Sequence, residues 1–562
     1  MKSKHGLRKW KSLSLVIAVA LAVAGCGGGT GSGGSSGSPS ASSPNGSAPG
    51  TQTASAEPAK RGRISASVYD RGTVPAEEGT MTDNRWTKWI NEQGPADVEF
   101  VSVPRFESLQ KFNVLLASGK APDLLFEYDT AFHGQLYNQK QLMPLDDLIE
   151  QYSTVYKQRL EQYPALKKAG MMADGKLYAV GRPLALNPQH YLFIRNDWLK
   201  KLNLQAPKTP EELLAVAKAF TEQDPDGNGK ADTQGIGLSF VAGIILNHMF
   251  GSGFTLFGTD QVPWILNDKD EVVHDWDRMQ AAIAFQKQIY DAGVADKDFV
   301  TDKNGEKQKQ AWITGKLGIY GGNGADVKVY ETLKANVPEA DVVPIALPKT
   351  AFGGFSPLLT TPVQVTAVVN ASAKDPEAVI KTIDFMSTEE YATTIEYGFD
   401  GVHSKYAPEG CPVEIDPEKN KAERNYNRDL NMLAALDGPC YQLANKPNPT
   451  PAQQDMIRIV DMAREAYMNP EAPMVGITQR NYLPLLPQDL QTINTNANKT
   501  ILDMAMKTIV SGSSYPVDKF MGDAKSAWEK AGGEKVDAFY ADWYKNNKDN
   551  AILMDDIYGM IK

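Results

Sequence analysis

The chain has few of the side chains that usually carry catalytic or metal chemistry. It contains 6 histidines and 3 cysteines among 562 residues, and no histidine lies in an H-E-x-x-H pattern. After the N-terminal segment the sequence has no run of basic residues, and its formal net charge is −10. This balance argues against nucleic acid as a partner. No stretch of 18 apolar residues occurs, so we expect no membrane-spanning helix.

Residues 1–25 have the pattern of a secretory signal peptide. Basic residues between positions 2 and 11 precede an apolar run over 13–24, which is too short to span a membrane. The run ends in Val-Ala-Gly-Cys, residues 23–26, which resembles a bacterial lipobox. The resemblance implies that Cys26 is lipidated and anchors the protein to the outer face of the bacterial cell membrane. A signal peptide cleaved beside a chance cysteine is the alternative.

Residues 26–63 are predicted to form a flexible linker. They consist largely of Gly, Ser, Ala, Pro and Thr, so they cannot bury a core. Residues 64–562 remain as the folded part, which is long enough for two or three domains. Within it, Cys411 and Cys440 either form a disulfide or stay free thiols, because the sequence does not show how closely their Cα atoms approach.

The start of the folded region alternates short β-rich runs with amphipathic helical segments. Strands are predicted over 64–69, 98–103 and 122–126, and helices over 83–93 and 107–118. This alternation is typical of an α/β fold with a mostly parallel sheet. Such sheets bind ligands beyond the carboxyl ends of their strands. Glu127, Tyr128 and Asp129 follow the third strand, so we expect them at a binding edge.

The segment DPDGNGKAD, residues 224–232, carries oxygen-bearing groups at every second position. It follows a helix predicted to begin after Thr209, because Thr209-Pro-Glu-Glu212 has capping signals. The groups that would turn toward one Ca²⁺ ion are Asp224, Asp226, Asn228, the carbonyl of Lys230, and Asp232.

The ligand set of this loop is incomplete, because Gly235 takes the place of the usual bidentate Glu. Extended chain is predicted over 236–241, where a calcium sensor would have its second helix. We therefore predict a structural rather than a switching site. A metal-free turn rich in Asp and Asn is the alternative.

Eight segments in a fixed order resemble the extracellular solute-binding lipoproteins of bacterial ABC importers, in the class that takes up large carbohydrates. They are 117–125, 174–178, 193–202, 209–232, 293–299, 315–319, 375–378 and 397–403. The resemblance implies a two-lobed α/β clamp, like that of periplasmic binding proteins, with a mostly parallel sheet in each lobe. The first lobe would combine about 64–180 with 345–390, and the second about 181–344 with 391–530. The C-terminal helices would pack across both lobes.

The same resemblance implies a monomer that encloses an oligosaccharide between its lobes and delivers it to ABC permease subunits without catalysis. It also implies one bound calcium ion, although Thr233 stands where relatives have a further carboxylate. Two other readings stay open at this point. A secreted enzyme acting on polysaccharide would need a positioned pair of carboxylates. A sensor that presents its sugar to a surface receptor would use the same clamp.

Sugar sites combine aromatic rings with carboxylate and amide groups, and this combination selects candidate contacts. Asp129 is the best acceptor by position and by resemblance, and Tyr128 either stacks on a sugar or fills the core. Four further candidates lie in predicted loops or at strand ends: Trp264, Tyr320, Asn323 and Phe355. Arg195 is either a partner for an acidic sugar or paired with Asp197. His403 is either a site residue or a buried loop histidine.

Overall fold

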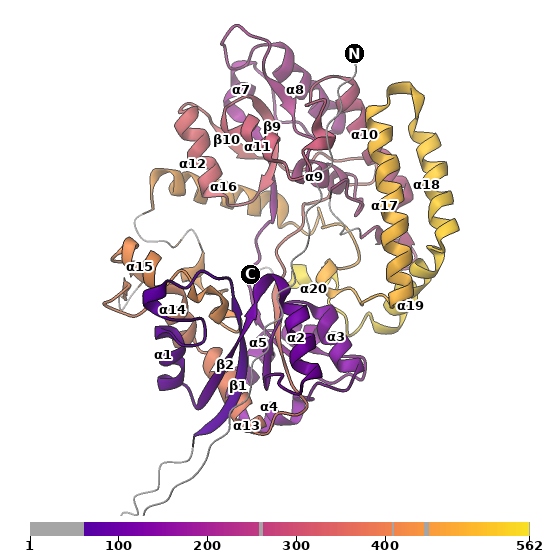
Figure 1. Cartoon of the computed structure of the whole chain (residues 1–562). Coiled ribbons are helices and arrows are strands. Elements are labelled where there is room, and N and C mark those ends of the chain that lie inside the picture. Colours follow the sequence, from indigo (N-terminus) through magenta and orange to yellow (C-terminus); the bar gives the residue numbers. More distant parts are fainter. Residues whose placement is uncertain (1–60, 258–261, 407–409, 443–444, 446–448, 561–562) are drawn as a thin grey trace, which may run out of the picture. The chain divides into compact units, whose positions relative to one another are not determined.

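The computed structural model describes residues 61–257, 262–406, 410–442, 445 and 449–560 (Figure 1). The predicted signal peptide, Cys26 and almost all of the predicted linker lie outside the described residues. The first strand begins at Gly62, just inside the range predicted for the linker. Among the described residues, no helix combines the length and apolar character needed to cross a membrane.

The first sheet contains five strands in the order β2-β1-β3-β11-β4. Their bounds are Gly62–Asp70 for β1, Ala96–Pro104 for β2, Leu124–Phe126 for β3, Ala179–Pro183 for β4 and Val363–Val369 for β11. β1 pairs in parallel with β2 and β3, whereas β11 is antiparallel to β3 and β4. The strands predicted near residues 64, 98 and 124 are therefore confirmed.

The second sheet contains four strands in the order β10-β5-β9-β6. Their bounds are His190–Arg195 for β5, Gln234–Ile236 for β6, Leu317–Asn323 for β9 and Val342–Pro344 for β10. Only β6 and β9 pair in parallel; β5 is antiparallel to both β9 and β10. Two short ribbons lie apart from these sheets: β7 (Trp264–Leu266) with β8 (Val272–His274), and β12 (Ser404–Lys405) with β13 (Val413–Glu414).

Both sheets are mixed, but only one strand in each runs against the others: β11 in the first sheet and β5 in the second. The remaining described strands of each sheet share one direction, which agrees with the predicted mostly parallel sheets. The reason for the reversal of β11 lies in the segments that cross between the sheets. The backbone N–H of Leu184 donates to the carbonyl of Pro362 at 2.8 Å, and Pro188 pairs with Leu359. The chain thus leaves the first sheet after β4 and re-enters it before β11 at the same end. β11 must then run opposite to β4.

The first sheet and its helices share one hydrophobic core, which includes Ile64, Leu124 and Val368. The helices that contribute to it are α1 (Arg85–Gln93), α2 (Ser108–Ala117), α3 (Thr130–Asn138), α4 (Asp146–Tyr152), α5 (Val155–Gln162), α13 (Pro376–Met386) and α14 (Glu389–Tyr397). In Figure 1, α1 and α2 contact β2, and α13 contacts β1. Asp375 caps α13 by accepting a hydrogen bond from the N–H of Ala378, as its sequence predicts.

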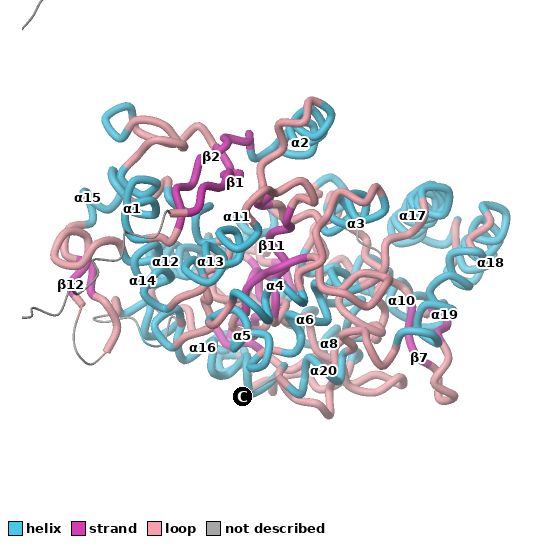
Figure 2. The backbone as a smooth tube through the Cα atoms, turned by 90° about the horizontal axis from the view of Figure 1, so that it is seen from below, coloured by secondary structure: helices cyan, strands magenta, loops and turns pink. Residues whose placement is uncertain are grey.

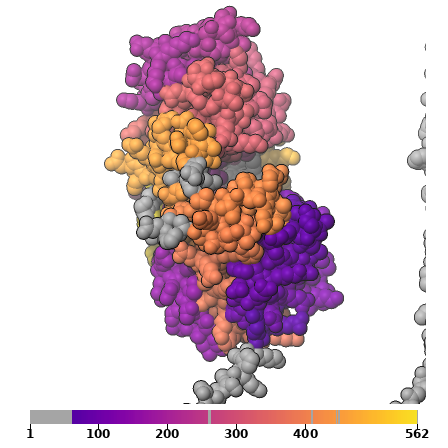
Figure 3. Space-filling model, turned by 90° about the vertical axis from the view of Figure 1, so that its left-hand side faces the viewer, coloured from indigo at the N-terminus to yellow at the C-terminus, as the bar shows by residue number. Residues whose placement is uncertain are grey.

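Apolar residues between 391 and 434 pack into this first core, whereas the sequence predicts 391–530 for the second lobe. Tyr391 and Leu430 are buried in it, and the Tyr391 hydroxyl donates to the Leu430 carbonyl at 2.8 Å. Arg85 also forms an ion pair with Glu423, close to α15 (Pro417–Glu423). Figure 3 shows this orange segment against the indigo N-terminal strands and helices. Apolar side chains in α14 and its following loop thus bury against the first sheet.

The second sheet has its own core, which includes Leu192, Ile236 and Ile319. Its helices are α7 (Asn196–Lys201), α8 (Pro210–Glu222), α9 (Val241–Met249), α10 (Trp276–Asp291), α11 (Glu306–Ile313), α12 (Val327–Asn336) and α16 (Pro451–Tyr467). Thr209 caps α8 by accepting from the N–H of Glu212 at 3.3 Å, which confirms the predicted helix start. Ile345 and Leu347 also pack here, although 345–390 is predicted for the first lobe.

The C-terminal helices α17 (Gln488–Val510), α18 (Val517–Ala531) and α19 (Glu534–Asn547) pack into the second core. Figures 1 and 2 show α17 and α18 side by side. Only α20 (Met554–Gly559) packs elsewhere, in a small cluster with Leu166 of α6 (Pro164–Gly170). The described C-terminal helices thus divide between two cores, and their packing across both lobes stays a prediction.

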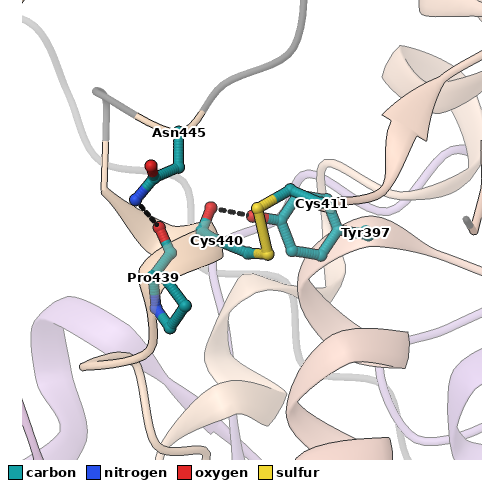
Figure 4. Close-up of a disulfide and its surroundings, with 5 residues drawn as sticks. All are labelled: Tyr397, Cys411, Pro439, Cys440 and Asn445. Carbon is teal, nitrogen blue, oxygen red and sulfur yellow. Dashed lines mark hydrogen bonds between the residues drawn. A yellow bond between two sulfur atoms is a disulfide. The ribbon is translucent and has the colours of Figure 1, made fainter. Parts of the chain in front are cut away.

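Cys411 and Cys440 form a disulfide, with Cα atoms 5.2 Å apart (Figure 4). The hydroxyl of Tyr397 donates to the carbonyl of Cys440, and the side chain of Asn445 donates to the carbonyl of Pro439 at 2.8 Å. The bridge thus ties the loop after β12 to the turn at Pro439–Tyr441, and the Tyr397 hydrogen bond connects that turn to the end of α14. This settles the alternative that the sequence leaves open.

Candidate ligand-binding site

Tyrosine and arginine side chains gather at the carboxyl ends of β1, β2, β3 and β4. The rings of Tyr69 and Tyr128 stack with centroids 5.9 Å apart. The guanidinium of Arg105 lies over both rings, 4.6 Å from the centroid of Tyr69 and 5.4 Å from that of Tyr128. We call Tyr69, Arg71, Arg105, Tyr128 and Arg182 the tyrosine–arginine cluster. It occupies the sheet edge where parallel strands end, the usual place for a ligand in α/β folds.

Arg71 and Arg182 have different partners. The guanidinium of Arg71 forms a bidentate ion pair with Asp429, at 2.6 and 2.9 Å. Arg182 is buried and donates to the carbonyl and side-chain oxygens of Asn431 at 2.6 and 2.9 Å. Its other edge meets only the amide oxygen of Gln364, at 3.1 and 3.3 Å. Burial lowers the pKa of Arg182.

The ring of Tyr128 is partly buried, and its hydroxyl makes no hydrogen bond within the described residues. Burial raises the pKa of Tyr128, while the charges of Arg182, Arg105 and Arg71 oppose that rise. Of these arginines, Arg105 lies against the ring itself, 5.4 Å from its centroid. Beside Arg105, the side chain of Phe106 is 88 % exposed. Sequence reasoning missed Phe106, although an aromatic residue directly after a predicted strand is a visible signal.

The turn after β3 is built around a buried carboxylate. Glu127 accepts hydrogen bonds from the Ser108 hydroxyl at 2.6 Å and from the N–H groups of Tyr128 and Asp129 at 2.7 and 3.0 Å. Asp129 is the N-cap of α3 and accepts from the N–H of Phe132 at 3.0 Å. Asp129 is half-buried, so it lies at the predicted sheet edge and has a structural role as well.

A second candidate region lies beside β9, in a crevice of about 110 Å³. Tyr320 and Asn323, both predicted from the sequence, line it together with Trp312 and Phe240. The rings of Trp312 and Tyr320 stack 5.0 Å apart. Phe240 precedes α9 with φ 42° and ψ −109°, a conformation that is strained for a side chain with a Cβ atom. Nothing in the sequence signals this strain.

A larger hollow of about 490 Å³ lies between α17 and the segment 483–486. Leucines from that segment form one wall, and amide side chains from α17 form the other: Gln491, Asn494 and Asn498. None of the residues predicted to contact ligand lines this hollow. The mixed apolar and amide lining would also suit a sugar, because it offers both a flat contact and hydrogen-bonding groups.

Trp264 and Phe355 are buried away from the tyrosine–arginine cluster. Trp264 is 1 % exposed, and its indole N–H donates to Asp537 at 2.8 Å. Its ring centroid also lies 4.3 Å from that of Tyr540, so Trp264 packs in the second core, and its contact with ligand stays a prediction. Phe355 is 8 % exposed beneath the guanidinium of Arg278, 5.1 Å from its ring.

Arg195 and His403 have the structural roles that the sequence leaves as alternatives. Arg195 is 2 % exposed, pairs with Asp197 at 2.9 and 2.5 Å, and stacks over Trp198. His403 accepts a hydrogen bond from the N–H of Phe399 at 3.0 Å, and its Nε2 lies 3.2 Å from Glu423. Burial lowers the pKa of His403.

The calcium-like loop folds as a compact turn. Asp224 accepts hydrogen bonds from the N–H groups of Asn228 and Gly229 at 3.1 and 2.9 Å. The Asn228 amide donates to Asp226 and Asp232 at 2.8 and 3.1 Å. Strand β6 begins at Gln234, directly after the loop, so the prediction that no paired helix follows is confirmed.

Lys316 forms ion pairs with two of the predicted metal ligands. Its Nζ lies 2.8 Å from Asp226 and 2.9 Å from Asp232. Burial alone would lower the pKa of Lys316, but these carboxylates raise it. Thr233 is buried and donates to the carbonyl of Phe220 at 2.8 Å, so its hydroxyl is directed away from the loop.

The donor set fits a hard cation in chemistry, because carboxylate, amide and carbonyl oxygens are the ligands that calcium prefers. The spatial arrangement of these groups is less favourable for a metal ion than their chemical types are. Within the described ranges, no group of three or more His, Cys, Asp or Glu side chains is arranged to hold a metal ion. The ammonium of Lys316 supplies the positive charge between Asp226 and Asp232 in this structure.

Two mixed sheets, each with its own core, joined by antiparallel crossing segments, define the class of two-lobed binding proteins. The polar and aromatic residues at the strand ends agree with that class. A family model described as bacterial extracellular solute-binding protein matches residues 84–393, more than half of the chain. The chain belongs to this family. It is therefore a solute-binding protein and not an enzyme.

Curated relatives cover much of the chain at low identity. The polygalacturonan/rhamnogalacturonan-binding protein YtcQ of Bacillus subtilis is 26 % identical over 369 residues, which is 63 % of this chain and 69 % of YtcQ. The lipoprotein LipO of the same organism is 23 % identical over 457 residues, which is 78 % of this chain and 84 % of LipO.

Solved structures share the fold. The Streptococcus pneumoniae ABC-transporter substrate-binding protein FusA, in complex with kestose, has a TM-score of 0.63 at 19 % identity. The similarity covers 87 % of this chain and 100 % of FusA. A structure of the FusA EF-hand mutant, in complex with fructo-nystose, gives a TM-score of 0.62. At this identity the likeness shows the two-lobed fold alone.

Proposed function

We propose that this protein captures an oligosaccharide outside the cell and delivers it to the membrane subunits of an ABC importer. The observation that carries the proposal is the tyrosine–arginine cluster at the strand ends of the first sheet. Its rings offer flat surfaces for sugar C–H groups, and its guanidinium N–H groups donate to ring hydroxyls. The relative YtcQ is a polygalacturonan/rhamnogalacturonan-binding protein, and FusA has been solved in complex with kestose; both support the choice of ligand class.

The two cores support an assignment of lobes that differs from the one expected from sequence. In this proposal the first lobe comprises about 61–183 with 363–436, and the second comprises about 190–347 with 451–547. The segments 184–189 and 348–362 would form the hinge. A ligand held between the lobes is shielded from water, which strengthens its polar contacts.

Anchoring through lipidated Cys26 is part of the same proposal. The linker after Cys26 would let the binding region move beside the permease while staying near the membrane. The relative LipO, itself described as a lipoprotein, supports this arrangement. We propose that the protein works as a monomer on the outer face of the bacterial cell membrane.

The loop around Asp224–Asp232 is proposed as a weak structural calcium site. Asp224, Asp226, Asn228, Asp232 and the carbonyl of Lys230 would hold the ion, with Lys316 displaced from the two carboxylates. The EF-hand described for FusA supports a metal in this fold. Calcium would tie α8 to β6 and to the loop before β9. We therefore expect chelation to lower the melting temperature more than it lowers affinity for sugar.

A thermal-shift screen tests the proposed function. Purified protein without its signal peptide is mixed with neutral and acidic oligosaccharides, each with its monosaccharide as a control. A ligand that binds only the folded state at a hundredfold excess over its Kd adds about 2.7 kcal/mol to the free energy of unfolding. Chromatography should return the stabilising sugar intact. If no oligosaccharide raises the melting temperature, or if the sugar is shortened, the proposal is wrong.

A further inference from the structure

Arg182 is a buried cation without an anionic partner among the described residues. The residue is 8 % exposed, and no carboxylate lies within ion-pair distance of it. The charges of Glu396 and Asp429 act on it from farther away, and Asp429 is already paired with Arg71. A guanidinium cannot lose its proton in a protein, so it cannot avoid the cost of burial by becoming neutral.

The hydrogen bonds of Arg182 leave one edge weakly occupied. Its Nη1 edge is well filled by the two oxygens of Asn431, at 2.6 and 2.9 Å. Its Nε and Nη2 atoms share the single amide oxygen of Gln364, at 3.3 and 3.1 Å. That fork is the edge that a carboxylate fills with two parallel hydrogen bonds. The Arg71–Asp429 pair, at 2.6 and 2.9 Å, shows such bidentate geometry beside it.

Arg105 is a second unpaired cation in the same cluster. It forms no ion pair within the described residues, and it is held over the rings of Tyr69 and Tyr128 by cation–π contacts. Its side chain is half-buried. The carboxylates next to these residues in sequence already accept other hydrogen bonds. Glu127 accepts from Ser108, Tyr128 and Asp129, Asp129 accepts from the Phe132 N–H, and Asp70 accepts from the Gly72 N–H and the Ser102 hydroxyl. None of them forms an ion pair with Arg105 or Arg182 within the described residues.

We propose that the ligand of this protein is an oligosaccharide that carries carboxylates, and that Arg182 and Arg105 are the residues that select it. This inference rests on the proposed function and adds the charge of the ligand to it. One carboxylate of a uronate unit would replace Gln364 on the open edge of Arg182. The sugar ring would lie against Tyr128, whose free hydroxyl donates to the same unit. Arg105 would pair with a carboxylate of a neighbouring unit.

A neutral sugar would be a poor hydrogen-bonding partner for the Nε–Nη2 edge of Arg182. A hydroxyl oxygen on Arg182 would compensate neither the buried charge nor both N–H groups of the fork, whereas a planar carboxylate does both. The relative YtcQ is described as binding polygalacturonan, a polymer of acidic sugars. That ligand class agrees with the arginines of the tyrosine–arginine cluster.

The test compares two probes that differ only in charge, tri-galacturonate and its fully methyl-esterified form. Calorimetric titration of the wild-type protein should give at least tenfold tighter binding of the acid. Raising the salt concentration from about 50 to 500 mM should weaken binding of the acid more than binding of the ester, because ions screen the attraction. Equal affinity for acid and ester would overturn the inference.

Two variants test which arginines cause the preference for the acid over the ester. Arg182→Gln and Arg105→Gln should each reduce the preference for the acid several-fold. Arg105 makes no hydrogen bond in the described structure, so its variant reports on selection even if Arg182→Gln fails to fold. Arg159→Gln is the matched control, since Arg159 donates only to the carbonyl of Ser387, at 2.9 and 2.5 Å, and should keep the preference.

The outcomes separate this inference from the proposed function. If Arg105→Gln and a folded Arg182→Gln both keep the full preference for acid, the assignment to these arginines is wrong. If a neutral oligosaccharide binds while neither galacturonide does, the inference fails and the proposed function stands. If no oligosaccharide of either charge binds, both fail.

Discussion

Asp129 caps helix α3, so its side chain supports the fold whether or not it also contacts a sugar. The expectation from position alone is that a change there would affect only binding. The hydrogen bond from the Phe132 N–H to Asp129 changes that expectation, because losing a cap typically costs about 1 kcal/mol of stability. A loss of affinity in a variant must therefore be separated from a loss of folding.

We predict that Asp129→Ala lowers both the free energy of unfolding, by about 1 kcal/mol, and the affinity for oligosaccharide, by roughly tenfold. Asp375→Ala is the matched control, since Asp375 caps α13 through the same kind of bond, at 3.0 Å from the Ala378 nitrogen. It should cost similar stability and leave affinity unchanged. Denaturant unfolding and calorimetry measure the two effects. If both variants bind sugar as the wild type does, the Asp129 side chain caps α3 and does not contact the sugar.

Asp275 is a buried carboxyl group at the start of α10. Its Oδ2 accepts from the Gly253 N–H at 2.8 Å, and its Oδ1 lies 3.7 Å from the ring nitrogen of His274. Burial raises the pKa of Asp275 to about 7, against the partial opposition of Arg278. Burial also lowers the pKa of His274 to about 3, so that ring stays neutral beside it.

A raised pKa in the folded state makes stability fall as pH rises. Between about pH 4, near the unfolded pKa of Asp, and pH 7 the folded protein binds more protons at Asp275 than the unfolded chain does. We predict that Asp275→Asn removes this loss, so its stability relative to the wild type is greater at pH 8 than at pH 4. Urea unfolding at both pH values measures the difference. Parallel pH profiles for the two proteins would show that Asp275 does not titrate in this range.

At the scale of elements, Lys316 links the start of β9 to the calcium-like loop. Its ion pairs with Asp226 and Asp232 mean that a calcium ion must displace the ammonium before it can use both carboxylates. We predict that Lys316→Met raises calcium affinity about tenfold or more and lowers the melting temperature in chelator. The reason is that the variant loses a competing cation and leaves two facing carboxylates unpaired.

Calcium titration by calorimetry measures this effect. Lys309→Met is the control, because Lys309 pairs with Glu306 at 2.6 Å and lies outside the loop. It should bind calcium as the wild type does. An unchanged affinity in Lys316→Met would mean that the lysine does not compete. If neither the wild type nor the variant binds calcium, the loop is a turn held by Lys316 alone.

Local signals predicted the helices and strands well, because their causes are local. Thr209 and Asp375 cap the helices that their sequences predict. β1 and β2 fall where apolar and polar residues alternate, and β3 falls on a continuous apolar run. The direction of β11 could not be read in this way. It depends on the end of the first sheet at which the crossing segment returns, and only the pairing of Pro188 with Leu359 reveals that end.

The candidate site was only partly predictable for the same reason. Tyr128 and Asp129 follow a predicted strand, so the sheet edge could be located from sequence. Trp264 looked equally suitable, but its indole N–H is bound by Asp537, 273 positions later in a C-terminal helix. The buried charge of Arg182 likewise depends on Gln364 and Asn431, which come from distant segments.

At the scale of the whole molecule, the proposed anchor is a single residue. We predict that Cys26→Ser moves the protein from the membrane fraction to the culture medium or soluble fraction, because a thiol is required for the lipid. The described residues contain no helix able to cross a membrane in its place. Fractionation followed by a salt wash measures the change. A variant that stays in the washed membrane pellet would show that another contact retains the protein.

The central claim is that the tyrosine–arginine cluster binds an oligosaccharide, and Tyr128 tests it most directly. The measurement is a calorimetric titration of wild-type protein and Tyr128→Ala with the oligosaccharide that stabilises the wild type most. The account predicts one sugar bound per chain and at least tenfold weaker binding in the variant, equivalent to about 1.4 kcal/mol. Unchanged affinity in a folded Tyr128→Ala would place the binding site elsewhere and contradict the account.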